Sequence, residues 1–359
     1  MKKQVYVLYG GKSAEHQVSI DSALNVLNEL NKQLYDVFAV YITEDGKWNK
    51  PFQVGSKRLE REQIMKETEL EVRASIHQFF QNSFDSNSII FPVLHGTFGE
   101  DGKLQGMLEM LDLPYVGNGV NAAAVGMDKV MSKQLFATND IPQTPYIYFT
   151  KELFLHREEY YLNLIKSKIH FPCYVKPANM GSSVGISYCQ NKLELERAIG
   201  EAFLYDDKIL IEKEIVGKEV IIGVTGNNHQ LTCSLAGEWK REQQFFDYED
   251  KYLDENLTPQ IPALIHTETY EQICDYAKQA YTALGGTGLM RIDFFITDEQ
   301  KIYLNEVNTL PGFTTYSMFP VLIEKTEGLS YSELLDRLIK LGFQAYENRN
   351  TLQYRRVSV

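Results

Sequence analysis

The segment that constrains the fold most is LMRIDFFITDEQKIYLNEVNTLPGF, Leu289–Phe313. Two runs of β-branched and aromatic residues flank the polar stretch Asp298–Lys301, a pattern typical of a β-hairpin. A turn centred between Glu299 and Gln300 determines which residues of the two strands lie opposite each other. The segment therefore predicts an antiparallel ribbon with a defined register.

Four polar residues fall on one face of this ribbon. In the predicted register Asp293 lies opposite Glu306, and Arg291 lies opposite Asn308. Side chains that oppose each other directly have Cβ atoms about 4.5–5.5 Å apart. Because side chains alternate between faces, both faces also receive apolar residues and are expected to be at least partly covered. The polar face is expected to carry Phe295, Ile302 and Leu304, and the other face Ile292, Phe294, Ile296, Tyr303 and Val307.

Two opposed carboxylates on a covered face favour a bound cation. They repel each other and lose hydration, which is costly without a compensating charge. Asp293, Glu306 and Asn308 supply only hard oxygen ligands, which suit Mg²⁺, an ion that commonly shares its coordination with phosphates. The alternative is a solvated polar face with an ion pair between Asp293 and Arg291, and spacing alone leaves both hypotheses open.

A second informative segment is KPANMGSSVGIS, Lys176–Ser187, between two predicted strands. Backbone N–H groups and hydroxyls of such a run can bind a phosphate, and Lys176 adds positive charge. A simple turn is the alternative, because glycine-rich and serine-rich segments are mostly turns. The run lacks the G-K-[ST] ending of a Walker A loop and the G-x-G-x-x-G of a Rossmann fingerprint. Combined with the candidate Mg²⁺ site, it indicates a nucleoside triphosphate enzyme with another fold.

Bulk composition limits the classes of partner. The chain has 359 residues, which suggests two or three domains, and 44% hydrophobic with 23% charged residues is typical of a soluble globular protein. A net charge of −12 argues against non-specific nucleic-acid binding. An anionic small molecule would need a local basic pocket or a metal ion.

Targeting and redox signals are weak. No apolar run approaches the roughly 20 residues of a membrane helix, so no membrane insertion is expected. The N-terminal apolar run ends at two glycines without a cleavage pattern, and it predicts a buried strand rather than a signal peptide. The cysteines Cys173, Cys189, Cys233 and Cys274 are scattered, which indicates reduced thiols of a cytosolic protein rather than a disulfide frame or zinc site.

Strands alternate with helices in the first third of the chain, which predicts a parallel α/β sheet. Its ligands would lie beyond the carboxyl ends of strands, where YGGKSAEH (9–16) and LHGTFGEDG (94–102) occur. A helix is expected over 13–32 with Ser13 as its N-cap. Farther on, the polar segment EWKREQQFFDYEDKYLDEN (238–256) lacks a hydrophobic period and is predicted to be a lid loop.

Several motifs follow one another in a fixed order. They are GGKSAEHQVS, LHGTFGEDG, VGNGV, MDK, YVKPANMGSSVGIS, EKEIVGKE, FFDYEDKY, RIDFF and NEVNTLPGFTTYSMFP. This series resembles the D-alanine–D-alanine ligase family of the ATP-grasp superfamily, from the first strand to about Leu338. The terminal ENRNTLQYRRVSV carries no part of the resemblance.

The resemblance implies a three-domain ATP-grasp fold that combines α/β and α+β parts. A Rossmann-like substrate-binding α/β domain is expected over residues 1–124 and a central ATP-grasp subdomain over 125–217. A C-terminal ATP-grasp and metal-binding domain is expected over 218–359, with the lid loop near 238–256.

The resemblance also implies a nucleotide site. Lys129 and Lys176 resemble the lysines that contact the ATP phosphates, Glu212 the acceptor for the adenine amino group, and Glu219 the ribose ligand. Contacts with ATP are implied for Lys129, Lys176, Gly181, Ser182, Ser183, Glu212, Lys213, Ile215, Glu219 and Asn305. Asp293, Glu306 and Asn308 match the ligands of two Mg²⁺ ions, with Mn²⁺ as a substitute.

Two D-alanine sites are implied beside the nucleotide. Glu15 resembles the residue that meets the first ammonium group, and Ser317 and Lys251 resemble groups that take the second carboxylate. Catalytic roles are implied for Glu15, Ser182, Tyr252, Arg291 and Gly312, and substrate contacts for His95, Lys251, Ser317 and Met318.

The implied reaction is ATP-dependent synthesis of D-alanyl-D-alanine through an acyl phosphate, for peptidoglycan precursors, in a cytoplasmic homodimer. The alternative acceptor is D-lactate, but Tyr252 favours an amine. A non-catalytic ATP-binding regulator would be expected to lose metal ligands or Arg291, and all of them are present. Gln17 and Phe246 depart from the family, in which Glu and Tyr are frequent at these positions.

Overall fold

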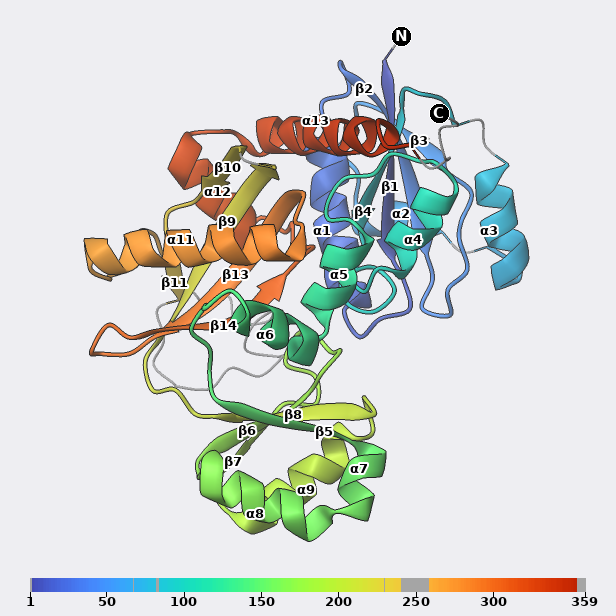
Figure 1. Ribbon diagram of the computed structural model, residues 1–359. Coiled ribbons are helices and arrows are strands. Elements are labelled where there is room, and N and C mark those ends of the chain that lie inside the picture. Colours follow the sequence, from blue (N-terminus) through green and yellow to red (C-terminus); the bar gives the residue numbers. More distant parts are fainter. Residues whose placement is uncertain (1, 67, 82–83, 229, 240–257, 354–359) are drawn as a thin grey trace, which may run out of the picture.

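The structure, a computed structural model, describes residues 2–66, 68–81, 84–228, 230–239 and 258–353. Within these residues the strands form one largely parallel sheet and two antiparallel sheets, with helices packed against them (Figure 1). This mixture confirms the expected combination of α/β and α+β architecture.

The first sheet has the strand order β3-β2-β1-β4, in which β2, β1 and β4 are parallel. Its elements are β1 (Lys3–Gly10), α1 (His16–Glu29), β2 (Tyr35–Ile42), β3 (Phe52–Val54), α2 (Arg61–Ile64), α3 (Val72–Phe80), β4 (Ser88–Val93) and α4 (Lys103–Met110). Residues of α1 share a core with one face, and residues of α3 and α4 pack on the other. Burial on both faces explains why these strands are almost continuously apolar.

Helix α1 begins three residues later than predicted. Glu15 occupies the N-cap position and makes no side-chain cap hydrogen bond, so the prediction of Ser13 as the N-cap is wrong. Ser13 Oγ instead accepts a hydrogen bond from the N–H of Glu15 at 3.1 Å. Ser13 therefore shapes the turn before the helix and helps to place Glu15.

Two short helices lead from the first sheet toward the others, α5 (Val120–Met127) and α6 (Lys129–Ala137). Asp128 separates them and caps α6, because its side chain accepts hydrogen bonds from the N–H groups of Val130 and Met131. This cap fixes Lys129 as the first residue of α6.

The second sheet is antiparallel, with the order β5-β8-β6-β7. Its elements are β5 (Tyr146–Thr150), α7 (Lys151–His156), α8 (Glu158–Lys168), β6 (Cys173–Pro177), β7 (Ser187–Cys189), α9 (Lys192–Ala202) and β8 (Lys208–Lys213). Ile209 and Ile211 of β8 pack in a core with residues of all three helices. Alternation along the strand therefore turns Glu212 to the opposite face, away from these helices.

The third sheet has the order β12-β11-β9-β13-β14, and β10 also pairs with β9. Its elements are β9 (Lys218–Asn227), β10 (Gln230–Cys233), β11 (Gly237–Trp239), β12 (Pro259–Gln260), α11 (Thr267–Leu284), β13 (Gly288–Ile296), β14 (Ile302–Asn308), α12 (Met318–Glu327) and α13 (Tyr331–Asn350). Residues of α11 pack on one face of the sheet, and residues of α12 pack against Ile221 on β9. Of the predicted lid, Glu238 and Trp239 belong to β11, and residues 240–257 lie outside the described residues.

The hairpin of β13 and β14 has the predicted register where the polar residues lie. Arg291 pairs with Asn308, and Asp293 pairs with Glu306. A β-bulge at Asn305 then shifts the register by one residue toward the turn. Ile302 and Leu304 consequently join the apolar core, and Tyr303 lies opposite Phe295, so these three residues were assigned to the wrong faces.

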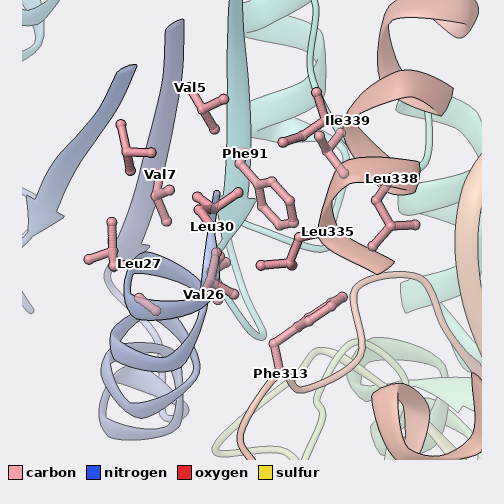
Figure 2. Close-up of a cluster of buried hydrophobic side chains, with 14 of the residues drawn as sticks. Val5, Val7, Val26, Leu27, Leu30, Phe91, Phe313, Leu335, Leu338 and Ile339 are labelled. Carbon is pink, nitrogen blue, oxygen red and sulfur yellow. The ribbon is translucent and has the colours of Figure 1, made fainter. Parts of the chain in front are cut away.

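The last described helix returns to the first sheet. Leu335, Leu338 and Ile339 of α13 share a buried cluster with Val5 and Phe91 of the first sheet (Figure 2). Residues from opposite ends of the chain therefore form one core.

The four cysteines are free thiols, as predicted, but they lie in two pairs. Cys173 and Cys189 are opposite each other on β6 and β7, and Cys233 Sγ is 2.8 Å from Cys274 Sγ. None of the helices in the described part of the chain combines the length and apolar character needed to span a membrane.

Candidate active site

A cleft lies between the polar faces of the second and third sheets. It is lined from β6 and β8 by Lys176 and Glu212, and from β13 and β14 by Phe295 and Glu306. All ten residues predicted to contact ATP line it: Lys129, Lys176, Gly181, Ser182, Ser183, Glu212, Lys213, Ile215, Glu219 and Asn305.

Positive charge in the cleft comes from lysines held by local contacts. Lys129 Nζ donates a hydrogen bond to the carbonyl of Met180 at 2.6 Å and lies 3.5 Å from Glu306 Oε2. Lys176 Nζ lies 2.5 Å from Glu212 Oε2 and 3.4 Å from Asn305 Oδ1. These ammonium groups form the local basic site that an anionic ligand needs in a chain of net charge −12.

Glu212 is a buried carboxylate between two lysines. Its Oε1 lies 2.6 Å from Nζ of Lys133, and its Oε2 contacts Lys176. Burial alone raises the pKa of this carboxyl, but the two ammonium groups outweigh burial and hold the pKa at about 2. Glu212 is therefore ionised at neutral pH and remains a hydrogen-bond acceptor inside the cleft.

The glycine-rich loop after β6 closes one end of the cleft. Ser182 and Ser183 both have left-handed backbone angles, with φ of 48° and 60°. Two successive non-glycine residues in this region are strained by about 1 kcal/mol or more each, a cost commonly found at ligand sites. Ser182 Oγ donates a hydrogen bond to Glu15 Oε1, which connects the loop to the first sheet.

A second, acidic pocket adjoins the cleft. Its charged lining residues are Glu15, Glu100, Lys129, Arg291 and Glu306. It shares part of its wall with the cleft: Lys129, Met180, Gly181, Ser182 and Glu306 line both. Three carboxylates make this pocket suitable for an ammonium group.

Burial perturbs the two N-terminal carboxylates of this pocket. It raises the pKa of Glu15 to about 7, with a further contribution from Glu100, while the hydrogen bond from Ser182 opposes the rise. Burial likewise raises the pKa of Glu100 to about 8. A substrate ammonium placed between these groups would favour their ionised forms.

Arg291 and Asp293 form a bidentate ion pair on β13. Arg291 Nε and Nη2 donate to the two carboxylate oxygens of Asp293 at 2.9 and 2.7 Å. The ion pair of the alternative hypothesis is thus present. Asp293 itself is only 2% exposed, whereas the side chains of Arg291 and Glu306 are 23% and 31% exposed, so the face is partly solvated. Burial raises the pKa of Asp293 to about 6, Arg291 opposes the rise, and repulsion from Glu306 adds to it.

The hairpin residues fit a hard divalent cation. Asp293 and Glu306 occupy paired positions, and repulsion from Glu306 raises the pKa of Asp293, which a cation would relieve. Asn308 is two residues farther along β14, and its Oδ1 accepts a hydrogen bond from the N–H of Leu310 at 3.0 Å. Within the described ranges, no group of three or more His, Cys, Asp or Glu side chains is arranged to hold a metal.

His95 lies behind the acidic pocket. Its Nδ1 is 3.0 Å from the carbonyl of Leu310, its Nε2 is 3.0 Å from Ser22 Oγ, and Glu100 is 3.6 Å away. Burial lowers its pKa, which keeps the ring neutral at neutral pH. These contacts are those of a buried histidine that supports neighbouring residues.

Five predicted residues lie outside the walls of both cavities as the structure describes them, namely His95, Asp293, Gly312, Ser317 and Met318. A Cβ atom on Gly312 would come within 2.7 Å of Ser317 Oγ, so these two residues are in close contact. Ser317 precedes α12 and its Oγ lies 2.7 Å from Thr314 Oγ1, while Met318 is buried against Leu322. Lys251, Tyr252 and Phe246 fall outside the described residues. The departure Gln17 is an exposed residue whose Oε1 accepts a hydrogen bond from Arg61.

Sequence reasoning missed two buried residues of this region, Glu100 and Lys133. Glu100 stands in the motif LHGTFGEDG at the end of β4, where position alone could have indicated it. Lys133 lies one helical turn after Lys129 in MDKVMSK, a spacing that places both on one face of α6.

Comparison with known proteins identifies the family. Family models described as "D-ala D-ala ligase N-terminus" and "D-ala D-ala ligase C-terminus" match residues 4–118 and 135–340. The chain is 44% identical over 362 residues to the D-alanine–D-alanine ligase of Geobacillus thermodenitrificans, with 99% of each chain covered. It is 43% identical over 356 residues to that of Staphylococcus carnosus, again with 99% of each covered.

Solved structures agree with these matches. The D-alanine-D-alanine ligase from Coxiella burnetii superposes with a TM-score of 0.80 at 29% identity, covering 98% of this chain and 96% of that chain. The VanG D-Ala:D-Ser ligase from Enterococcus faecalis gives 0.78 at 32% identity, covering 95% and 100%. This chain therefore has the ATP-grasp fold and belongs to the D-alanine–D-alanine ligase family.

Proposed function

We propose that this protein joins two molecules of D-alanine to D-alanyl-D-alanine, with conversion of ATP to ADP and phosphate, for peptidoglycan precursor synthesis. The observation that supports this most is the wall shared by the two cavities, at Lys129, Met180–Ser182 and Glu306. A γ-phosphate in the nucleotide cleft and a carboxylate of an amino acid in the acidic pocket would meet there. Relatives that are 41–44% identical bear the name of this activity.

The proposed reaction has two steps. A carboxylate oxygen of the first D-alanine attacks the γ-phosphorus of ATP, the bond to ADP breaks, and an acyl phosphate forms. The amine of the second D-alanine then attacks the acyl carbon, the amide bond forms, and inorganic phosphate leaves with loss of a proton from nitrogen. Exclusion of water protects the acyl phosphate, and we assign this task to the loop near 238–256.

The charges of the site support definite roles. Glu15 receives the first ammonium group and Ser182 orients it, since the two are hydrogen-bonded. Lys129 and Lys176 offset phosphate charge, because both line the cleft as ammonium groups. For the second step we assign Arg291 and the N–H of Gly312 to the oxyanion.

Divalent metal use is typical of the family, and we propose two Mg²⁺ ions, replaceable by Mn²⁺, at Asp293, Glu306 and Asn308. When bound, the metal would neutralise charge on the transferred phosphoryl group. We further propose a cytoplasmic homodimer with three domains, at residues 1–124, 125–217 and 218–359. For the second D-alanine we assign Ser317, Lys251 and Met318 to its site, with Tyr252 beside Glu15 and His95 in support.

The activity is tested by incubating the protein with ATP, Mg²⁺ and D-alanine and measuring dipeptide and ADP. We expect equal amounts of both, and no product with L-alanine. Absence of ADP release that depends on D-alanine would overturn the proposal. Glu306→Gln should abolish product, whereas Glu299→Gln, in the exposed turn of the same hairpin, should retain it.

Acceptor choice is tested by competing D-alanine with D-lactate and D-serine near neutral pH. D-serine is included because the relative from Enterococcus faecalis is named for it. We expect dipeptide of D-alanine to dominate, and dominant depsipeptide would instead assign the protein as a D-alanine–D-lactate ligase.

A further inference from the structure

Lys133 is a buried lysine for which the proposed reaction has no use. It lies on α6, its side chain is 2% exposed, and its Nζ is 2.6 Å from Oε1 of Glu212, itself 3% exposed. The Nζ also lies 5.5 Å from the centre of the Tyr146 ring. Burying a lysine to this extent costs desolvation free energy. Its ion pair with Glu212 therefore cannot be explained as an ordinary surface salt bridge.

The two lysines on Glu212 differ in their access to the ligand. Lys176 lines the nucleotide cleft, whereas Lys133 does not belong to the cleft wall that the structure describes. Lys133 is therefore ion-paired with Oε1 from the protein side, and Lys176 with Oε2 from the side of the ligand. Only the second contact can be exchanged for a contact with a bound molecule.

Charge balance explains why one lysine is not enough. In the proposed reaction Lys176 moves to the ATP phosphates, and Glu212 accepts the adenine amino group in its place. Among the described residues Glu212 is ion-paired with Lys133 and Lys176, so without Lys133 it would then be a buried carboxylate without either partner, a costly arrangement. Lys133 compensates this charge permanently and keeps the carboxylate in one orientation.

We propose that Lys133 is a positioning residue for base recognition: it fixes Oε1 of Glu212 so that Oε2 is presented to the exocyclic amino group of the nucleotide. The inference rests on the proposed function of the cleft. It extends that function to the selection of a 6-aminopurine over a purine without this group.

The test compares the binding of MgATP with that of the magnesium salt of purine riboside triphosphate, which carries hydrogen in place of the amino group. Isothermal titration calorimetry without D-alanine measures both dissociation constants directly. A hydrogen bond to a charged acceptor predicts that wild type prefers ATP by about 10- to 150-fold. In Lys133→Met the preference should fall to less than about threefold, because the acceptor is no longer held in place.

Lys208→Met is a matched control. Lys208 of β8 is ion-paired with Asp128 at the start of α6. This ion pair connects β8 to α6, as the pair of Glu212 and Lys133 does, but it does not involve Glu212. We expect its preference for ATP to remain that of wild type. The proposal is overturned if both dissociation constants rise by the same factor in Lys133→Met, so that the wild-type preference is kept, or if wild type itself shows no preference.

Two further variants cover a failure of Lys133→Met to fold. Lys133→Arg keeps the charge and should retain the preference, whereas Lys133→Met combined with Glu212→Gln removes both partners and should lose it. Preference in the double variant, or its loss in Lys133→Arg, would contradict the proposal. Because binding is measured without turnover, a protein that binds ATP selectively but forms no dipeptide would refute the proposed reaction and leave this inference standing.

Discussion

Ser182 and Glu15 are joined by a hydrogen bond from Oγ to Oε1, although they are 167 positions apart in the chain. A Cβ atom on the neighbouring Gly181 would come within 3.0 Å of Glu15 Oε2, so the loop backbone also lies close to this carboxylate. The glycine-rich loop therefore contacts the first sheet and the nucleotide cleft at the same time. Movement of this loop on ATP binding would act directly on the amino-acid pocket.

Replacing Ser182 with Ala should impair both substrates. The loop loses its hydroxyl contact with Glu15, a hydrogen bond to an ionisable group that is worth about 1.5–3 kcal/mol. We expect kcat/KM for D-alanine to fall by about 10- to 100-fold and KM for ATP to rise. Steady-state kinetics of dipeptide formation measure this, with Ser187→Ala in the adjacent strand β7 as a control. Equal kinetics of Ser182→Ala and wild type would show that the contact has no role.

The pH dependence of D-alanine use should report Glu15. Burial raises the pKa of this carboxyl to about 7, so the ionised form that attracts ammonium is gained as pH rises through that value. We expect kcat/KM for D-alanine to increase about tenfold per pH unit below pH 7. Ionisation of the acceptor amine changes kcat/KM in wild type and in Glu15→Gln alike. The part of the pH dependence of kcat/KM that is present in wild type and missing in Glu15→Gln therefore belongs to Glu15. A limb that persists in the variant would assign the pKa to another group.

Glu100 should make the unliganded protein less stable at high pH. Burial raises its folded-state pKa from 4.5 to about 8, so the folded state binds the extra proton between these values. The free energy of unfolding from this group consequently decreases as pH rises from about 4.5 to 8. We expect Glu100→Gln to exceed wild type in unfolding free energy at pH 8.5 by at least about 1 kcal/mol, and to show no gain at pH 4. Urea titrations at both pH values measure the difference, and parallel shifts at both would contradict it.

The acceptor preference should depend on Tyr252. Its hydroxyl is predicted from the resemblance to complete a hydrogen-bonded set with Glu15 and Ser182. Tyr252→Phe removes that hydroxyl, so we expect the share of D-alanyl-D-lactate to rise in a competition assay. Product ratios are measured by mass spectrometry from pH 6 to 9, and ratios unchanged across this range would refute the role.

Leu338 should be important for stability rather than chemistry. It is fully buried in the cluster that joins α13 to the first sheet (Figure 2). Leu338→Ala removes a large side chain from a packed core, which costs about 2–5 kcal/mol. Thermal unfolding should occur several degrees lower, while kcat at 20 °C stays near wild type. Exposed Leu352→Ala, close to the end of the same helix, is the matched control and should change neither.

The polar pairs of the hairpin could be predicted because strand alternation is a local property. Asp293 opposite Glu306 follows from counting back from the turn, and the structure has this pairing. The bulge at Asn305 could not be predicted in this way. It depends on Leu304 reaching the core beneath the sheet, which is a matter of tertiary packing.

Distant contacts marked the limit of sequence reasoning in the site as well. The resemblance predicted that Glu212 and Lys176 belong to the ATP site. Lys133, judged from the sequence alone, is one polar residue of an amphipathic helix. Its burial becomes visible only when β8 is placed beside α6. Ser13 was wrongly predicted to be the N-cap for a related reason. A turn that residue propensities do not indicate precedes α1, so the helix begins later in the chain.

The position of α13 affects how the chain can fold during synthesis. Strands β1 and β4 precede residues 331–350, which form part of the cover over them, by more than 200 positions in the chain, so they emerge from the ribosome first. Until then Val5, Val7 and Phe91 lack that cover, and exposed apolar strands are prone to aggregation. The first sheet is thus translated long before the helix that completes its core.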